Sequence, residues 1–483
     1  MVTLKTASSN SIKGDFRIKQ MGWLIMVLFV SVSVMTLTGC SKPEEPAVLA
    51  PLEGEINDLA TDFIAALVAE DFEAASGYFD AEMLKAIPTD KLEDLWEQLL
   101  SQVGPYQNEI GRKQETSEGY EVIIATVKFE KSPLNIRMVF NDDHRISGLF
   151  FQPAEEAAVE TPAYEVPNYA APERIEEREI VIGEGDWALP GTLTLPAGEQ
   201  GSGQEWPLVV LVHGSGPNDR DETIGPNKPF KDLALGLASE GVAVLRYDKR
   251  TLVHGQKLMA EVPELTVQEE TIEDALLAVD LAMAMPEVDA SRVYVLGHSL
   301  GGMLAPRIGV QSNGLAGLII MAGAARPLEE LMLEQMTYLA GIDGDVTDYE
   351  TANLKEVKEH VARIQDPKLD PKTPQSQLLG VPAAYWLDLQ GYKPAEVAKT
   401  LDLKMLILQG ERDYQVTMAD FELWKTALSG RNGVMLETFP ELNHLMMTGS
   451  GSSAVGTLST PEEYNVAGHV SVEVIQAILE FVN

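Results

Sequence analysis

An alternation of uninterrupted apolar runs with segments of helical periodicity fills most of this chain from residue 208 to its end. Strands that are apolar throughout and alternate with helices form a mostly parallel sheet with helices on both faces. Two shorter runs before them, 179–182 and 191–195, predict an opening antiparallel pair. We therefore predict an α/β domain over 175–483, with strands at 208–212, 242–247, 293–296, 318–322, 405–408 and 434–439 and helices at 230–239, 271–285, 300–310, 418–428 and 472–482.

The first forty residues have the order of an export signal. Four basic residues precede an apolar run at 21–37, which ends in Leu37-Thr38-Gly39-Cys40. This order is typical of a signal peptide, here 1–39. The alternative is an uncleaved membrane anchor, since the run approaches the roughly 20 residues that span a bilayer. Against it, Cys40 is the only cysteine in the chain and directly follows the run.

The tetrapeptide Leu-Thr-Gly-Cys resembles the bacterial lipobox, whose cysteine is lipidated after cleavage. The resemblance implies a lipid anchor on Cys40 and a membrane partner. Ser41 follows in place of aspartate, which in the same resemblance implies the outer membrane or the cell surface of a bacterial envelope. With one cysteine, the mature chain holds no internal disulfide, so its stability must come from core burial.

A small α+β domain is predicted over 52–152, between a tether at 40–51 and a Pro-, Glu- and Ala-rich linker at 153–174. Helical spacing at 56–68 and 92–100 precedes strand-like runs at 120–129, 134–140 and 146–151. This order resembles the α+β roll of the nuclear-transport-factor and cystatin kind. His144, Asp142 and Asp143 are either a solvated hairpin turn, which we favour, or metal ligands. The sequence does not indicate what this domain does.

The charge of the chain argues against one class of partner. Acidic residues outnumber basic ones 74 to 36, which gives a formal net charge of −38. A surface of this sign repels phosphate backbones, so nucleic-acid binding is disfavoured.

Gly297-His298-Ser299-Leu300-Gly301 lies between a predicted strand and a predicted helix. A G-x-S-x-G sequence is a weak signal alone, but at a strand-to-helix turn of a parallel α/β pattern it is typical of a serine nucleophile on a strained elbow. We therefore predict Ser299 as the nucleophile.

A serine nucleophile needs a histidine base and a buried carboxylate that orients it. Of the seven histidines, His444 is the one that follows the last predicted strand, at the carboxyl edge of the sheet, and we choose it. Asp413 follows the strand at 405–408 and is our choice of acid. Glu411 is the competing acid, and both carboxylates could instead be loop charges that pair with Arg412.

His213-Gly214-Ser215-Gly216-Pro217 follows the first long parallel strand. A glycine-rich loop at this position can direct backbone N–H groups at an oxyanion. We predict Ser215 N–H as the first donor, Gly214 N–H as second choice, and Leu300 N–H as the partner donor. The alternative is a simple glycine turn. A phosphate-binding loop is excluded because the Gly-Lys-Ser/Thr ending is missing.

Between 326 and 401 the strand–helix alternation lapses. An amphipathic stripe and an aromatic cluster at 385–387 occupy this insertion, which has the position of a lid. We favour core packing for the stripe over a substrate pocket; its residues are Leu328, Leu331, Met332, Met336 and Leu339.

Together these motifs resemble the α/β-hydrolase superfamily, in which the chain order is Ser, Asp, His. Within it, the segment 209–250, with Arg246-Tyr247-Asp248-Lys249-Arg250, and the Gln409-to-Asp413 and Asn443-His444 motifs resemble secreted bacterial carboxylesterases of the EstD kind over 175–483. The resemblance implies that the substrates are small-molecule short acyl esters and that their hydrolysis needs no cofactor. We also predict no metal. Dienelactone hydrolases of the superfamily use a cysteine nucleophile. This chain departs from that pattern, because its only cysteine is Cys40.

Two classes of alternative function stay open. An exopeptidase, amidase or thioesterase would use the same triad, although about 100 residues of α+β domain cannot build the β-propeller that prolyl-oligopeptidase relatives carry. A non-catalytic binding lipoprotein would work through its first domain, but the presence of all three candidate triad residues argues against it.

Overall fold

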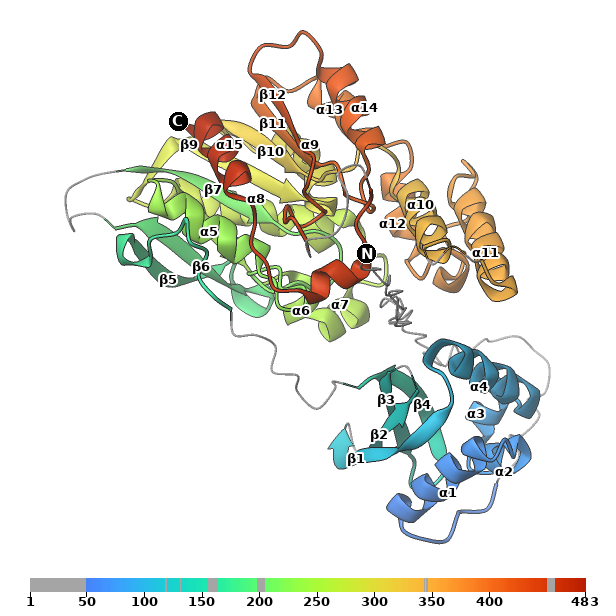
Figure 1. Cartoon of the computed structure of the whole chain (residues 1–483). Helices are drawn as coiled ribbons and strands as arrows, with labels where there is room; N and C mark the ends of the chain where they lie inside the picture. Colours follow the sequence, from blue (N-terminus) through green and yellow to red (C-terminus); the bar gives the residue numbers. More distant parts are fainter. Residues whose placement is uncertain are drawn as a thin grey trace, which may run out of the picture. The chain divides into compact units, whose positions relative to one another are not determined.

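The structure is a computed structural model that describes residues 49–483, apart from 118–119, 131, 155–163, 198–204, 343, 345 and 450–456. The chain divides into two compact units, Met1–Glu160 and Thr161–Asn483 (Figure 1). The predicted signal peptide, the anchor at Cys40 and residues 155–163 of the predicted linker lie outside the described residues. Within the described ranges, no helix combines the length and apolarity needed to cross a membrane.

The first unit places short helices before an antiparallel sheet, as its predicted α+β class requires. Strands β1 to β4 pair in chain order. Phe63 of the first helix, Trp96 of the fourth and Ile136 of the third strand meet in one buried core. The elements are α1 (Ile56–Val68), α2 (Phe72–Ser76), α3 (Ala81–Ala86), α4 (Thr89–Val103), β1 (Tyr106–Ser117), β2 (Tyr120–Phe129), β3 (Pro133–Phe140) and β4 (Ile146–Pro153).

The sequence did not predict β1, α2 and α3. Strand β1 is an edge strand that pairs only with β2, and most of its side chains are at least partly exposed. Its sequence is therefore polar and lacks the apolar alternation of a half-buried strand. The two short helices are capped by the preceding residues, Asp71 and Asp80, whose side chains accept hydrogen bonds from Ala74 N–H and Met83 N–H.

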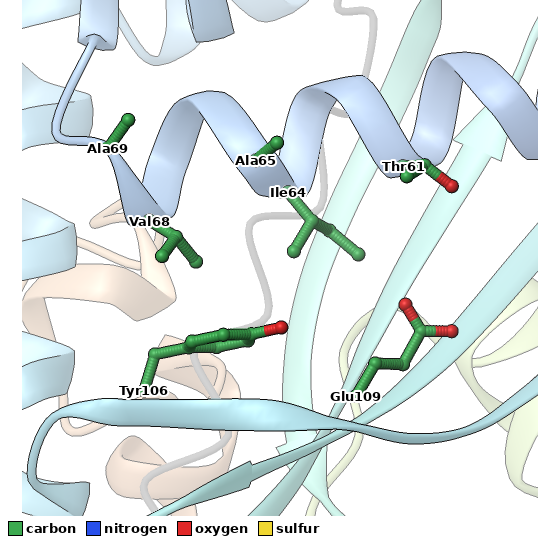
Figure 2. A pocket seen from close by; sticks show the side chains of 7 residues that line it. All are labelled: Thr61, Ile64, Ala65, Val68, Ala69, Tyr106 and Glu109. Carbon is green, nitrogen blue, oxygen red and sulfur yellow. The ribbon is translucent and has the colours of Figure 1, made fainter.

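A pocket of about 330 Å³ opens between α1 and β1 in the first unit. Figure 2 shows Ile64 and Val68 of α1 facing Tyr106 and Glu109 of β1. The predicted hairpin turn between β3 and β4 holds His144, whose Nδ1 lies 3.0 Å from the carbonyl oxygen of Gly54. The described residues contain no group of three or more His, Cys, Asp or Glu side chains that could hold a metal ion.

The second unit is built on an eight-stranded sheet in the order β12-β11-β10-β9-β7-β8-β6-β5. Strands β7 to β12 are parallel to one another, whereas β6 is antiparallel to β8 and β5 to β6. The predicted mostly parallel sheet with an antiparallel opening pair is confirmed. The strands are β5 (Ile175–Ile182), β6 (Leu189–Pro196), β7 (Trp206–Val212), β8 (Ala243–Tyr247), β9 (Val288–His298), β10 (Gly317–Met321), β11 (Lys404–Gly410) and β12 (Val434–Phe439).

The apolar strands bury both faces of this sheet. Along β7, Leu208 and Val210 belong to one buried core, and Val209 and Leu211 belong to the other. This division follows from the two-residue period of a strand. Helices α5 (Pro229–Ser239) and α15 (Val472–Val482) cover one face, and α8 (Glu273–Met283), α9 (Leu300–Gln311) and α14 (Met418–Leu428) cover the other (Figure 1).

The insertion at 326–401 is helical, with α10 (Leu328–Ala340), α11 (Asp348–Ile364), α12 (Ala383–Leu389) and α13 (Pro394–Ala398). Leu331 of the amphipathic stripe is buried in the core of the second unit, and Met332 packs against a cluster that contains Trp386. Two helices that the sequence did not predict, α6 (Arg250–Val253) and α7 (Gly255–Glu261), follow β8.

The C-terminal part of the predicted linker, from Tyr164 onward, packs against α5. The Tyr164 hydroxyl donates a 2.7 Å hydrogen bond to Asp232 Oδ1, and Ala171 N–H donates to Ser239 Oγ at 2.8 Å. Tyr169 packs against the core that α5 shares with α15. The two tyrosines supply apolar and polar contacts that fix this segment.

Candidate active site

The turn between β9 and α9 holds Ser299 in a strained backbone conformation, with φ 52° and ψ −114°. Residues with a side chain rarely adopt a positive φ. Glycines at 297 and 301 make the turn sterically feasible: a Cβ on Gly297 would lie 2.1 Å from the Gly301 carbonyl oxygen, and one on Gly301 would lie 2.3 Å from the Val212 carbonyl oxygen. This is the geometry of an elbow that presents a serine at the carboxyl end of a strand.

Asp413 and His444 are in direct contact. His444 Nδ1 lies 2.7 Å from Asp413 Oδ2, and both side chains are buried. Asp413 follows β11 and His444 follows β12, its parallel neighbour, so the two turns meet at the same edge of the sheet. The other carboxylate oxygen, Oδ1, accepts hydrogen bonds from the N–H groups of Gln415 and Val416, at 2.8 and 3.0 Å. These backbone donors fix the carboxylate against the imidazole.

The competing acid, Glu411, points elsewhere. Its Oε1 accepts a 2.8 Å hydrogen bond from the Thr438 hydroxyl. Arg412 does not pair with Asp413 or Glu411; its guanidinium forms a buried ion pair with Glu463. Of the two acids that the sequence left open, the structure therefore brings Asp413, and not Glu411, to the histidine.

A second carboxylate–histidine pair lies beside the first, and sequence reasoning missed its acid. Glu222 Oε2 forms a 2.8 Å ion pair with Nδ1 of His298, the residue before Ser299. The other nitrogen of His298, Nε2, lies 3.0 Å from the carbonyl oxygen of His444. Both side chains of the pair are only 2% exposed. The sequence shows a group of acidic residues a few positions after His213, but nothing in it distinguishes Glu222 from its neighbours Asp219 and Asp221.

The pKa values of both members of this buried pair are shifted toward the ionised forms. Burial by itself raises the pKa of Glu222, but the neighbouring imidazole outweighs it, and the pKa lies below its ordinary value of 4.5. Burial likewise lowers the pKa of His298, and the Glu222 carboxylate outweighs it, so the pKa lies above 6.5. A carbonyl oxygen only accepts hydrogen bonds, so Nε2 carries a proton as well. The raised pKa and the contact of Nε2 with a carbonyl oxygen both favour the imidazolium form of His298.

The loop after β7 corrects one of the oxyanion predictions. Gly214 N–H donates a 2.8 Å hydrogen bond to Glu222 Oε1, so Gly214 is not available as an oxyanion donor. Among the hydrogen bonds of the described residues, none is donated by Ser215 N–H or Leu300 N–H. The loop lies against the serine, since a Cβ on Gly214 would be 3.2 Å from Ser299 Cβ. Ser215 and Leu300 remain the predicted donors.

His213 does not face the site. Its Nε2 lies 2.9 Å from the Asp219 carbonyl oxygen, and its ring packs on Phe230 and Tyr247. Burial lowers the pKa of His213 to about 4, so it is neutral at pH 7. This contact fastens the loop internally.

The insertion reaches the loop that carries Asp413. Gln335 of α10 donates a 2.9 Å hydrogen bond from Nε2 to the Gln415 carbonyl oxygen, and the rings of Tyr338 and Tyr414 stack with centroids 5.2 Å apart. The helical insertion therefore borders the loop that carries Asp413.

Comparison with known families agrees with this architecture. Residues 209–455 match the model described as "Alpha/beta hydrolase family", and residues 60–149 match one described as "Protein of unknown function (DUF3887)". The chain belongs to the alpha/beta hydrolase family. Within that family it is a relative of Esterase EstD of Thermotoga maritima, to which it is 40% identical over 425 residues, 88% of this chain and 95% of that protein.

Two further similarities are more distant. Over 128 residues, 26% of this chain and 15% of the relative, it is 31% identical to Acylamino-acid-releasing enzyme 1 of rice (Oryza sativa subsp. japonica). The solved structure of Est1E from Butyrivibrio proteoclasticus matches with a TM-score of 0.37 and 18% identity, over 55% of this chain and 90% of that one. The similarity to Esterase EstD is longer than the predicted segment 175–483, so the resemblance extends into the first unit.

Proposed function

We propose that this chain is a serine carboxylesterase that hydrolyses short acyl esters through an acyl-enzyme. The observation that carries the proposal is the contact of His444 Nδ1 with the buried Asp413 carboxylate, next to the strained turn of Ser299. The relationship to Esterase EstD supports the choice of esters as the substrate class.

Each residue has a defined role in the proposed reaction. His444 Nε2 takes the proton of the Ser299 hydroxyl while the Ser299 oxygen bonds to the ester carbonyl carbon. The N–H groups of Ser215 and Leu300 stabilise the oxyanion of the tetrahedral intermediate. His444 then gives the proton to the alcohol, which leaves as the ester C–O bond breaks. Water, deprotonated by His444, then attacks the carbonyl carbon of the acyl-enzyme. The bond between the acyl carbon and the Ser299 oxygen breaks, this oxygen takes the proton back from His444, and the acid is released.

Asp413 fixes the tautomer of His444 throughout. Its carboxylate accepts from Nδ1–H, which leaves the other nitrogen free to act as the base. When His444 becomes an imidazolium, the same carboxylate stabilises the charge. We further propose that the enzyme works at the outer membrane or the cell surface of a bacterial envelope, held by lipid on Cys40, as the lipobox-like sequence suggests.

The experiment is a substrate panel. The full chain is assayed with p-nitrophenyl esters of increasing acyl length and with aminoacyl p-nitroanilides, beside a Ser299→Ala control. Hydrolysis of short esters that exceeds anilide hydrolysis by orders of magnitude and disappears in the control is expected. Faster anilide hydrolysis would assign the chain to the exopeptidases instead, and activity that survives in Ser299→Ala would overturn the mechanism.

A further inference from the structure

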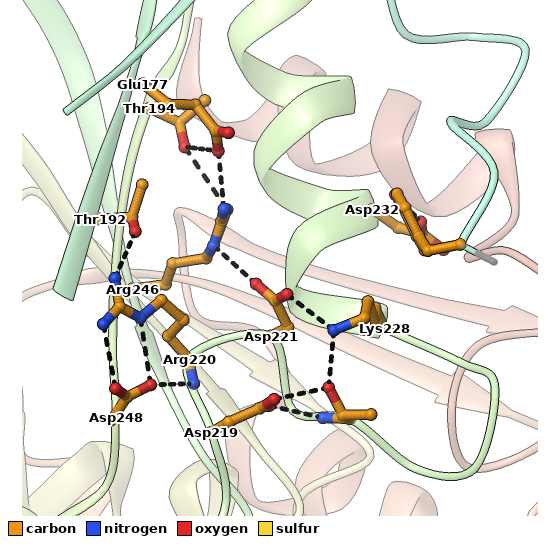
Figure 3. Close-up of polar contacts among 12 residues, drawn as sticks. Glu177, Thr192, Thr194, Asp219, Arg220, Asp221, Lys228, Asp232, Arg246 and Asp248 are labelled. Carbon is orange, nitrogen blue, oxygen red and sulfur yellow. Dashed lines mark hydrogen bonds and ion pairs between the residues drawn. The ribbon is translucent and has the colours of Figure 1, made fainter. Parts of the chain in front are cut away.

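The segment from Arg246 to Arg250 fastens the loop that follows β7. Arg246 Nε forms a 3.2 Å ion pair with Asp221 Oδ1. Asp248 Oδ2 forms a 3.0 Å ion pair with Arg220 NH2, and its Oδ1 accepts from Arg220 N–H at 2.8 Å. Figure 3 shows Arg220 and Asp221 of the loop directed at Asp248 and Arg246. These contacts fix the far half of the loop and leave Lys249, the residue after Asp248, for another partner.

Lys249 contacts the half of the loop that lies beside Ser299. Its Nζ donates a 2.8 Å hydrogen bond to the Gly214 carbonyl oxygen and a 2.6 Å hydrogen bond to Glu270 Oε1. The lysine side chain is 2% exposed. An ammonium group is costly to bury, and its placement against a neutral carbonyl rather than in solvent needs a compensating carboxylate, which Glu270 provides.

The carbonyl of Gly214 belongs to the same peptide group as the N–H of Ser215. A peptide unit is planar and trans, so its C=O and its N–H point in opposite directions. A cation held on the oxygen draws electron density toward it and leaves the N–H more positive, as in a chain of hydrogen bonds whose members polarise one another. The effect is largest in a buried site, where the effective dielectric is low.

We propose that Lys249 is a positioning residue of the oxyanion site, which holds and polarises the Gly214–Ser215 peptide so that Ser215 N–H stabilises the oxyanion. This inference rests on the proposed serine esterase mechanism. Lys249 contacts no substrate and acts only through the peptide.

The neighbouring contacts support orientation as well as polarisation. Asn218 Nδ2 donates to the same carbonyl oxygen at 3.2 Å, and Gly214 N–H is held by Glu222 at 2.8 Å. The peptides on both sides of Gly214 are therefore fixed before substrate arrives. An oxyanion donor that is fixed in advance costs no reorganisation in the transition state.

The partner of Lys249 links this peptide to the insertion. Glu270 lies in η3 (Gln268–Ile272), a π-helical turn, and its Oε2 accepts a 2.7 Å hydrogen bond from the Tyr385 hydroxyl of α12. π-Helical turns often occur at functional sites. A continuous chain of hydrogen bonds thus runs from the insertion through Glu270 and Lys249 to the predicted oxyanion donor.

The test compares Lys249→Met, which keeps the length of the side chain without its charge, with Lys257→Met. Lys257 lies in α7 and pairs with the exposed Asp186, so its loss removes the same charge away from the loop. For each variant, kcat is referred to the number of active sites found by endpoint titration. The affinity of a trifluoromethyl ketone, which adds Ser299 to form an oxyanion, is measured in parallel.

Loss of one oxyanion donor lowers kcat by about 100- to 1,000-fold, and loss of its polarising group should cost less, about 10- to 100-fold. We expect this loss in Lys249→Met with KM within about twofold, and an equal factor in the affinity for the trifluoromethyl ketone. Lys257→Met should match the wild type. A purely structural role would lower the number of titratable sites and leave kcat per site and inhibitor affinity unchanged, which would overturn the proposal.

A second pair of variants guards against misfolding, because Lys249→Met leaves Glu270 buried without its partner. Glu270→Gln alone and Lys249→Met/Glu270→Gln together separate the ion pair from the contact with Gly214. The double variant should lose as much kcat as Lys249→Met, and Glu270→Gln less than tenfold. Equal losses of kcat in Glu270→Gln and in the double variant would assign Lys249 to stability alone. Failure of both Lys249 variants to fold would lead to the same conclusion. Absence of ester hydrolysis in the wild type would instead refute the esterase function.

Discussion

His298 Nε2 lies 3.0 Å from the carbonyl oxygen of His444, a contact across 146 residues of sequence. The two imidazole rings are 4.7 Å apart between centroids, yet they have different partners: Asp413 for His444 and Glu222 for His298. The residue adjacent to the candidate nucleophile Ser299 therefore fixes the backbone of the candidate base. Glu222 extends this support to the loop after β7, because it also accepts from Gly214 N–H.

The Glu222–His298 pair should give the protein a pH-dependent stability. The pKa of Glu222 is lowered, so its contribution is present above 4.5 and is lost as the pH falls through its folded pKa. The pKa of His298 is raised, so its contribution is complete below 6.5 and is lost as the pH rises through its folded pKa. Glu222→Gln should therefore lower the free energy of unfolding most between pH 4.5 and 6.5, by about 3–5 kcal/mol.

Thermal unfolding of wild type and Glu222→Gln from pH 4 to 9 measures this difference, with the exposed Glu176→Gln as the matched control. A difference in Tm that stays constant over this range would show that the pair is not ionised in the fold.

The three candidate triad residues should behave as one unit. Ser299→Ala and His444→Ala should each lower kcat by several orders of magnitude, and the double variant should be little worse than either. Asp413→Asn should lower kcat by about ten-thousandfold, since it disturbs the tautomer but keeps nucleophile and base. Steady-state kinetics with a p-nitrophenyl ester measures these effects.

Glu411→Gln provides the control for the choice of acid, because Glu411 bonds to Thr438 and not to His444. It should keep kcat close to that of the wild type. A larger loss in Glu411→Gln than in Asp413→Asn would mean that Glu411 is the functional acid.

The segment 164–174 should contribute to the stability of the second unit. A chain that begins at Thr161 should fold and hydrolyse small esters, whereas one that begins at Ile175 lacks the Tyr164 hydrogen bond to Asp232, which is 0% exposed. Tyr164→Phe in the full chain, which removes the hydroxyl alone, should cost about 1.5–3 kcal/mol of unfolding free energy. Denaturant unfolding compares all three. Equal stability of the two truncated chains would return 164–174 to the linker.

Lipid attachment is tested at two neighbouring positions. Cys40→Ser should leave the precursor uncleaved or release the protein from the membrane fraction, because the thiol that would carry the lipid is gone. Ser41→Asp should keep the lipid but move the protein to the inner membrane, as the resemblance to the lipobox implies. Cell fractionation with immunoblotting measures both. A processed, membrane-bound Cys40→Ser protein would rule out anchoring at this cysteine.

The sequence alone determined the layered core of the second unit. Continuous apolar strands such as Leu208–Val212 can be buried only on both faces, so the parallel sheet follows from local composition. The Ser299 turn could also be predicted, since glycines at 297 and 301 mark a close crossing of strand and helix within a few residues. Polar edge strand β1 escaped prediction because its pairing, and not its own pattern, makes it a strand.

Only the tertiary structure decided which carboxylates meet which histidines. Asp413 and Glu411 are two residues apart in the same loop, and the direction of each side chain depends on backbone donors and on Thr438 of the neighbouring strand. Glu222 and Lys249 are unremarkable charges in sequence. Glu222 pairs with His298, 76 residues away, and Lys249 pairs with Glu270, 21 residues away. Local pattern fixes which faces are buried, whereas the pairing of buried charges depends on contacts that form only when the sheet is complete.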